Sequence, residues 1–286
     1  MILVIGATGT VGSEVVRQLR AEGQDVRALV RSAEKAAAVE EAGATAMVGD
    51  VARPDSLGPA LDGVDHVFLV LPGGPDQVEL ETNVIDAVKA AGDIHLVKLS
   101  VIGADPDAPV RFGANHGKVE QVLAASGVAH TLLRPTDFMQ NSFAWAGPIQ
   151  SDGRVYSPNA DAQIASIDVR DIAAVAVVAL TEPGHDGNTY ELTGPEALTR
   201  REQVATVASA IGREVEFVAV SNEQARDSML EAGYPEYAVG GIHELLVHVY
   251  DPGYAAQLRT GVKDATGNEP RSWADFAGDN AKVFSG

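Results

Sequence analysis

The sequence predicts an α/β fold, a doubly wound parallel sheet with helices on both faces, followed by a smaller mixed α/β lobe. Three observations predict it. Short apolar segments alternate six times with helix-like segments. Glycines follow the helix-like segments where a chain reversal is needed, and the alternation loosens after Pro135. With 286 residues and 45% hydrophobic content, the chain is long enough to form a substantial core.

The individual elements follow from this alternation. The apolar segments predict strands at residues 1–6, 25–30, 44–49, 65–72, 94–100 and 129–135. The segments between them predict helices at Val11–Glu22, Ala33–Glu41, Asp76–Ala91 and about His116–Ser126. Gly23, Gly43, Gly92 and Gly127 stand just after these helices, where a left-handed turn favours glycine. The order of strands and helices is typical of a sheet built from parallel crossovers.

The chain divides at about Pro135. Residues 1–135 are expected to form the main domain, and residues 136–286 a smaller substrate-binding lobe. A strand near 163–168, a strand at 188–194 and helices at 170–180 and 200–211 follow, with a helical tail to 284. Elements from about 160–195 are expected to rejoin the main sheet.

Composition excludes several classes of function. The 40 acidic and 21 basic residues give a formal charge of -19, which disfavours binding to nucleic acid or anionic membranes. The absence of cysteine excludes disulfides and thiolate chemistry, and the histidines show no metal-ligand spacing. The longest apolar run, residues 172–180, is far shorter than the roughly 20 residues of a membrane helix. We therefore expect a cytoplasmic protein without a metal.

The turn after the first strand carries a phosphate-binding pattern, "GATGTVG". Gly6, Gly9 and Gly12 are three residues apart at a strand-to-helix turn, where glycine permits a tight bend and close approach of a pyrophosphate. Backbone amides at the helix N-terminus attract anions. The pattern predicts a Rossmann fold with a dinucleotide held by Gly6, Thr8, Gly9, Thr10, Val11 and Gly12.

The end of the second strand favours NADP(H) over NAD(H). An acidic residue at this point would bind the ribose 2′-hydroxyl of NAD, but here Arg31 and Ser32 stand 19 and 20 residues after Gly12. An arginine suits the 2′-phosphate of NADP. Asp50, Val51, Leu71 and Pro72 follow the third and fourth strands, where the adenine half of the cofactor would lie. Asp50 is equally consistent with an exposed turn.

Longer segments resemble a known family. "GATGTVG", "ALVRS", "GDV", "KLSVIGA" and "EQVLAASGVAHTLLRPTDFMQN" are similar to the NmrA-like branch of the atypical short-chain dehydrogenase/reductases. The likeness spans nearly the whole chain and is strongest to members that reduce quinones, azo dyes or triphenylmethane dyes with NAD(P)H. It implies an NAD(P)H-dependent oxidoreductase.

The resemblance also locates an unusual substitution. Typical members of the wider superfamily carry Tyr-x-x-x-Lys, with a glutamate four residues after the lysine. Counting back from Glu120, His116 takes the lysine position and Phe112 the tyrosine position. Phenylalanine cannot donate a proton to a carbonyl that receives hydride. A quinone or dye needs less help, because the anion formed after hydride transfer is stabilised and solvent can protonate it.

Two candidate catalytic residues follow from the same comparison. His116 would act as a proton donor, orient the nicotinamide ribose, or cap and pack the start of its helix. Ser100, after the fifth strand, takes the position of the superfamily's catalytic serine; it would polarise a substrate oxygen and contact the cofactor, or serve only as a turn residue.

The segment after the sixth strand is expected to contact nicotinamide and substrate. Pro135 would offer main-chain groups to the carboxamide, and Phe112, Phe138, Met139 and Phe143 would wall an apolar pocket. Asp137 has two interpretations. Facing inward, it would disfavour anionic substrates or act as an acid or base; facing outward, it would be a surface group.

Three functions are compatible with these residues. The first is an NADPH-dependent reductase of an apolar, electron-poor small molecule. The second is a sensor that binds NADP(H) without catalysis and reports redox state to a protein partner. The third is a tailoring ketoreductase or isomerase of secondary metabolism that uses Asp137 or His116. A homodimer is compatible with each.

Overall fold

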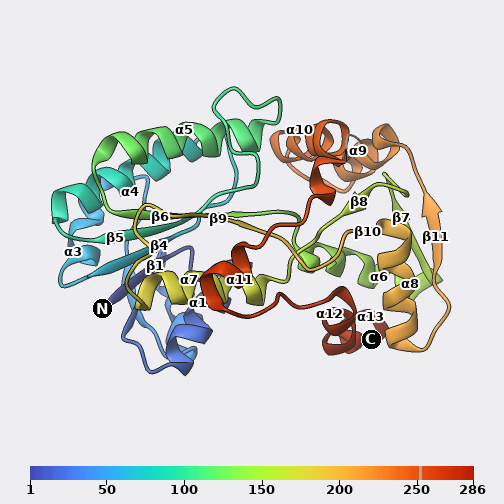
Figure 1. Ribbon diagram of the computed structural model, residues 1–286, viewed down its shortest axis with the longest axis horizontal. Helices are drawn as coiled ribbons and strands as arrows, with labels where there is room; N and C mark the ends of the chain where they lie inside the picture. Colours follow the sequence, from blue (N-terminus) through green and yellow to red (C-terminus); the bar gives the residue numbers. More distant parts are fainter. Residues whose placement is uncertain (251–252) are drawn as a thin grey trace.

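The computed structural model describes residues 1–250 and 253–286. Its centre is a parallel sheet of seven strands in the order β3-β2-β1-β4-β5-β6-β9 (Figure 1). Its strands are β1 (Ile2–Ile5), β2 (Val26–Val30), β3 (Thr45–Val48), β4 (His66–Leu69), β5 (His95–Leu99), β6 (His130–Pro135) and β9 (Thr189–Leu192). The prediction of a doubly wound parallel sheet is confirmed, and β9 extends it beyond the six strands of the first 135 residues.

Helices cover both faces of the sheet (Figure 1). On one face lie α3 (Gly58–Leu61), α4 (Gln77–Ala91) and α5 (Arg111–Ser126); on the other lie α1 (Thr10–Ala21), α7 (Val169–Thr181) and α11 (Gly261–Thr266). The short η1 (Pro54–Ser56) precedes α3, and α2 (Ala33–Glu41) lies beside β3. Side chains alternate along each strand, so Val67 and Leu69 enter the core beneath α4 while Phe68 enters the core beneath α7.

Helix α5 begins five residues earlier than the sequence suggested. Its first backbone amide, on Arg111, donates to Glu244 Oε2 at 2.8 Å. This carboxylate comes from α10 (Glu236–Leu245) and caps the N-terminus of α5. The N-cap residue itself, Val110, has no side chain that could do so. His116 therefore lies in the second turn of α5, and its interpretation as a cap at the helix start is wrong.

A small lobe sits beyond the carboxyl ends of the main strands (Figure 1). It comprises η2 (Met139–Trp145), α6 (Ala146–Asp152), β7 (Arg154–Ser157), β8 (Gln163–Ile164), β10 (Leu198–Thr199), α8 (Arg200–Ile211), β11 (Glu216–Ala219), α9 (Asn222–Glu231), α10, η3 (Leu246–Tyr250), η4 (Tyr254–Ala256), α12 (Trp273–Asp279) and α13 (Ala281–Ser285). Two short sheets, β10-β8 and β11-β7, support it. The strand expected at 163–168 is only two residues long, because the chain then leaves β10 to pair Ile167 with Phe138.

Aromatic packing holds the small lobe together. Trp273 and Phe276 of α12 pack at 5.3 Å between ring centroids, and Phe284 of α13 is fully buried beside them. A capping box starts α12, because the Ser272 hydroxyl accepts from the Asp275 amide while the Asp275 carboxylate accepts from Ser272. Among the helices of the described residues, none combines the length and the apolar character that a bilayer crossing requires.

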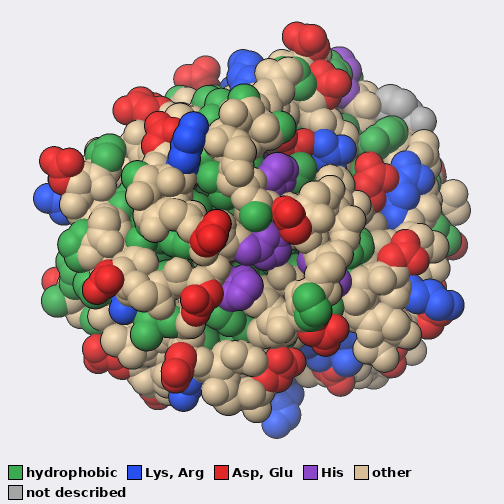
Figure 2. Space-filling view, turned by 60° about the vertical axis from the view of Figure 1, so that its left-hand side comes forward, with side chains coloured by type: hydrophobic (Ala, Val, Ile, Leu, Met, Phe, Trp, Pro, Cys, Tyr) green, Lys and Arg blue, Asp and Glu red, His purple; other side chains and the backbone are tan. Residues whose placement is uncertain are grey.

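A row of histidines lies at the amino-terminal ends of the strands, on the side of the sheet away from the small lobe. His66, His95 and His130 are the first residues of the neighbouring strands β4, β5 and β6, and the rings of His66 and His95 meet edge to face at 5.9 Å. Figure 2 shows histidine side chains gathered on this side of the molecule. Burial lowers the pKa of both His66 and His95, and neighbouring histidines lower the pKa of His95 further. Both rings are thus held neutral in the folded protein.

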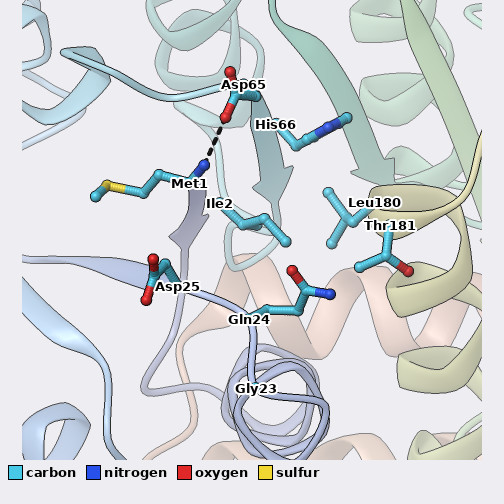
Figure 3. Close-up of a pocket in the computed structure, with 9 residues that line it drawn as sticks. All are labelled: Met1, Ile2, Gly23, Gln24, Asp25, Asp65, His66, Leu180 and Thr181. Atoms are coloured by element: carbon cyan, nitrogen blue, oxygen red, sulfur yellow. Dashed lines mark hydrogen bonds and ion pairs between the residues drawn. The ribbon is translucent and has the colours of Figure 1, made fainter.

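A hollow of about 310 Å³ opens beside this row (Figure 3). The amino group of Met1 forms an ion pair with Asp65 at 2.6 Å at its side, and His66, Leu180 and Thr181 also line it. It lies at the amino-terminal ends of the strands, whereas doubly wound folds bind ligands at the carboxyl ends. The hollow is therefore separate from the predicted cofactor site.

We predict that His66 and His95 make the fold sensitive to acid. The unfolded chain takes up protons near the ordinary histidine pKa of 6.5, before the folded chain does, so stability is present above that pH and is lost below it. Each such group contributes up to about 1.4 kcal/mol per pH unit. Urea unfolding at pH 7.5 and 5.5 should show a smaller loss in His95→Gln than in the parent.

The comparison with the parent removes effects of other titrating groups. Burial raises the pKa of Asp171 to about 6, so this carboxyl group stabilises the fold as the pH falls through this range. Its effect is opposite to that of the histidines and is the same in both proteins. An equal loss in the two proteins would contradict the prediction.

Candidate functional site

The glycine-rich turn between β1 and α1 has the tight geometry that the sequence predicted. Gly6 has φ of 87°, and a Cβ on it would lie 2.2 Å from the carbonyl oxygen of Val70. A Cβ on Gly12 would lie 2.2 Å from the carbonyl oxygen of Gly6. Only glycine fits at these two positions. The first and third glycines therefore allow strand, turn and helix to pack in direct contact.

This turn leaves helix amides available to an anion. Gly9 is the N-cap of α1 and supplies no side-chain acceptor, and no acidic residue stands in the first turn. Thr8, Gly9 and Thr10 are exposed, whereas Val11 is buried in the core. The positive end of the helix dipole and the free amides suit a pyrophosphate. The residues present thus fit a dinucleotide.

The other predicted cofactor residues lie at the same edge of the sheet. Arg31 and Ser32 directly follow β2, and the Arg31 side chain is exposed. Asp50 follows β3; its carboxylate accepts from the Ala52 amide at 3.0 Å, as in a tight turn. Beside it, buried Val51 accepts at its carbonyl from the Asn83 amide group at 3.0 Å.

Leu71 and Pro72 lie two and three residues after β4, and Pro72 is exposed. The structure therefore places the predicted contacts at the carboxyl ends of β1 to β4, side by side.

Ser100 belongs to a buried polar group at the end of β5. Its hydroxyl donates to Glu120 Oε1 at 2.5 Å, and Arg134 of β6 forms a two-pronged ion pair with the same carboxylate. The Ser100 side chain is buried, and its proton is committed to Glu120. Its role here is to tie β5 and β6 to α5.

His116 contacts a second buried group, which sequence reasoning missed. Lys98 on β5 is completely buried, and its ammonium lies 2.8 Å from Glu81 Oε2 and 2.9 Å from His116 Nδ1. Gln77 donates to Glu81 Oε1 at 2.9 Å and contacts the imidazole. Burial and the positive charge of Lys98 hold the pKa of His116 well below its usual range, so the imidazole is neutral.

A signal for Lys98 was present in the sequence. Leu96, Lys98 and Ser100 alternate onto the face of β5 that α4 and α5 cover, so a lysine there must find a buried partner. Glu81 is the matching carboxylate on α4. Both lie on positions whose burial was predictable, although their pairing depends on how α4 sits on the sheet.

Phe112 lies one turn before His116 on α5, against the small lobe. A Cβ on Gly241 of α10 would lie 2.4 Å from Phe112 Cζ, and a Cβ on Gly73 after β4 would lie 3.1 Å from its Cδ1. Its ring lies edge to face with the ring of Tyr237, with 6.3 Å between the ring centroids. The tip of the ring thus points at α10, and a hydroxyl at Cζ would meet Gly241.

Asp137 points inward, so it is not the surface group that was one interpretation. Its carboxylate lies 3.1 Å from Arg200 of α8 and accepts from Tyr250 and Ser166 at 3.1 and 2.9 Å. Arg200 also lies over the ring of Tyr250. Burial and Asp137 raise the pKa of Tyr250, so its phenol stays protonated. The pair of Asp137 and Arg200 carries no net charge.

The apolar residues after β6 that were predicted to line one pocket pack in different parts of the structure. Pro135 ends β6 and is buried, and Phe138 packs against the core beneath α7. Met139 is 1% exposed inside the small lobe. Phe143 stacks on Phe276 at 5.6 Å. Of the predicted substrate residues, Phe112 lies beside Gly73 after β4 and Met139 lies in the lobe's own core, whereas Phe143 is exposed at the surface of that core.

Phe112 provides no acidic group at the position where the resemblance leads us to expect a tyrosine. Within residues 1–250 and 253–286, no group of three or more carboxylate and imidazole side chains is placed to hold a metal ion. Beside Phe112 on α5, His116 is neutral, and Glu120 is paired with Ser100 and Arg134.

Comparison with known proteins agrees with the fold. The profile of the NmrA-like family matches residues 1–269. The chain belongs to the NmrA-like family. It is 43% identical over 284 residues to the NAD(P)H azoreductase of Xenophilus azovorans, covering 99% of each chain.

Two further similarities support the assignment. A Streptomyces griseus enzyme, (4-alkanoyl-5-oxo-2,5-dihydrofuran-3-yl)methyl phosphate reductase, is 38% identical over 288 residues, covering 100% of this NmrA-like chain and 99% of the relative. The crystal structure of the NADPH-dependent quinone oxidoreductase QOR2 of Escherichia coli in complex with NADPH superposes with a TM-score of 0.87. That pair is 27% identical, and the match covers 98% of this chain and 99% of the other.

We predict that Gly12→Ala damages both fold and cofactor binding, whereas Gly9→Ala leaves the fold intact. The added methyl at position 12 would meet the Gly6 carbonyl at 2.2 Å, but at position 9 the nearest atom is 3.4 Å away. Overpacking of this kind costs about 1–3 kcal/mol. Thermal melts with and without NADPH measure both effects. Equal melting temperatures for the two variants would contradict the steric account of this turn.

Proposed function

We propose that this NmrA-like protein is an NADPH-dependent reductase of an apolar, electron-poor acceptor such as a quinone or an azo dye. In this proposal hydride passes directly from cofactor to acceptor, and no tyrosine donates a proton. The names of the relatives support the general class, because the azoreductase and the Streptomyces enzyme are both called reductases.

One observation carries the absence of a protein acid. Phe112 stands where a proton-donating tyrosine would be expected, and its ring tip is pressed against Gly241. One turn later, His116 is a neutral imidazole rather than an imidazolium, because it is buried next to Lys98. Neither side chain supplies a readily released proton at neutral pH.

The chemistry then depends on the acceptor. A bound nicotinamide supplies a hydride, that is, two electrons and one proton. A quinone that takes up this hydride becomes a quinol anion, and one proton from solvent completes the quinol. The protein is left to orient the acceptor and exclude competing water, which accounts for much of the rate in such reactions.

The preference for NADPH rests on the residues after β2. Arg31 is exposed at the edge of the site, with Ser32 beside it, and the first carboxylate along the chain is Glu34. A guanidinium binds a phosphate through parallel hydrogen bonds. The 2′-phosphate of NADPH is therefore the expected partner of Arg31.

Turnover with a panel of acceptors tests the reductase. Purified protein is mixed with NADPH and either quinones, azo dyes or triphenylmethane dyes, and the loss of NADPH absorbance is followed against a blank without protein. Consumption above the blank, with one quinol formed for each NADPH, supports the proposal. Tight NADPH binding without consumption on any acceptor would instead favour the redox sensor, and turnover only with ketones would favour a tailoring ketoreductase.

We predict that Arg31→Ala weakens NADPH much more than NADH. Removing an exposed charge-assisted contact to the 2′-phosphate should raise the KM for NADPH by roughly 10-fold. NADH lacks that phosphate, so its KM in the same variant is the internal control. If the ratio of the two KM values stays as in the parent, Arg31 does not bind the 2′-phosphate.

A further inference from the structure

Three polar atoms lie within 3.0 Å of the ammonium nitrogen of Lys98. They are Glu81 Oε2 at 2.8 Å, His116 Nδ1 at 2.9 Å and the carbonyl oxygen of Leu99 at 3.0 Å. An ammonium has three N–H bonds and no acceptor site. Glu81 supplies the counter-charge in a fully buried position, and Leu99 and His116 lie at hydrogen-bonding distance from the ammonium, which cannot accept. His116 Nδ1 must then accept and cannot carry a proton of its own.

We infer that Lys98 is a positioning residue, which fixes His116 as the neutral tautomer with its proton on Nε2. The ring can therefore offer a hydrogen bond from Nε2 but not from Nδ1. This inference rests on the proposed function for its catalytic meaning, since His116 would donate this bond to the bound cofactor or acceptor. Its structural content can be tested without any turnover.

The surroundings of His116 support this assignment. Lys98 from β5 is the cation next to the ring, and Glu81 from α4 faces Lys98 on its other side. The amide nitrogen of Gln77 on α4 donates to Glu81 and lies almost equally far from the two ring nitrogens, at 3.3 and 3.2 Å, so this contact does not distinguish between the tautomers. On α5, Glu120 is held by Ser100 and Arg134. Burial and Lys98 both lower the pKa of His116, in agreement with a neutral ring.

The arrangement also explains why a lysine is retained in the core. A buried ion pair gains little stability over an apolar pair of the same size, because desolvation offsets the attraction. If the ion pair only filled space, apolar residues could replace Lys98 and Glu81 together. A lysine that donates to His116 has a second task, which is to choose the tautomer.

Nuclear magnetic resonance of the ring nitrogens provides the test. Full-length protein with ¹⁵N-labelled histidine is measured without cofactor between pH 6 and 8, and His116→Gln identifies the His116 signals by their loss. We expect Nδ1 to be unprotonated, Nε2 to be protonated, and neither to change over this range. A proton on Nδ1, or an imidazolium at pH 7, would overturn the inference. A neutral amine at Lys98 that accepts from Nδ1 would give the first of these results.

Removal of both buried charges tests the role of Lys98 itself. Lys98→Met combined with Glu81→Leu leaves no unpaired charge, which favours folding. We expect His116 to populate both tautomers. We also expect the pKa of His116 to rise toward the range of pH 6 to 8 that the experiment covers. For an acceptor that the parent reduces, kcat should fall by about 10-fold or more while the KM for NADPH changes less than about twofold.

A matched control separates this effect from the loss of any lysine. Lys118 is exposed on α5, two residues after His116, and Lys118→Met should change neither the ring signals nor kcat. A folded double variant with unaltered His116 signals would overturn the inference. If the double variant does not fold, the spectrum of the parent protein alone decides which tautomer His116 adopts. Absence of turnover in the parent would refute the proposed reductase, and the tautomer result would stand independently.

Discussion

The buried ion pair between Lys98 and Glu81 is the constraint on which the site end of the sheet depends. It joins the middle of the sheet to α4 at a distance of 2.8 Å, with both side chains excluded from water. Breaking one half would leave a lone charge in the core, a cost of about 3–5 kcal/mol. Helix α4 must therefore sit where its carboxylate meets β5. The position of His116 on α5 follows from the same contact.

A second pair, Glu120 with Arg134, extends this constraint toward β6. Together the two groups fix α4 and α5 over the strands at whose ends the proposed catalytic residues lie. The glycine turn is fixed in another way. At Gly6 and Gly12 the backbone packs so tightly that shape alone determines the turn. Ion pairs thus position α4 and α5, whereas close backbone packing determines the shape of the glycine turn.

The sequence predicted those features that are encoded locally. Apolar runs located all six strands of the first 135 residues, and the spacing of three glycines located the tight turn between β1 and α1. The start of α5 could not be found in this way, because its cap is Glu244, more than 130 residues away. The orientation of Asp137 likewise depends on Arg200 and Tyr250, which reach it from distant parts of the small lobe.

The path of the chain has a consequence for how the protein unfolds. It passes from the main sheet into the small lobe after β6, returns for α7 and β9, leaves again through β10, returns for α11 and ends in α12 and α13. Neither region is a continuous segment that could be cut out or made alone. The two regions share one set of covalent connections and should lose their structure in one cooperative transition.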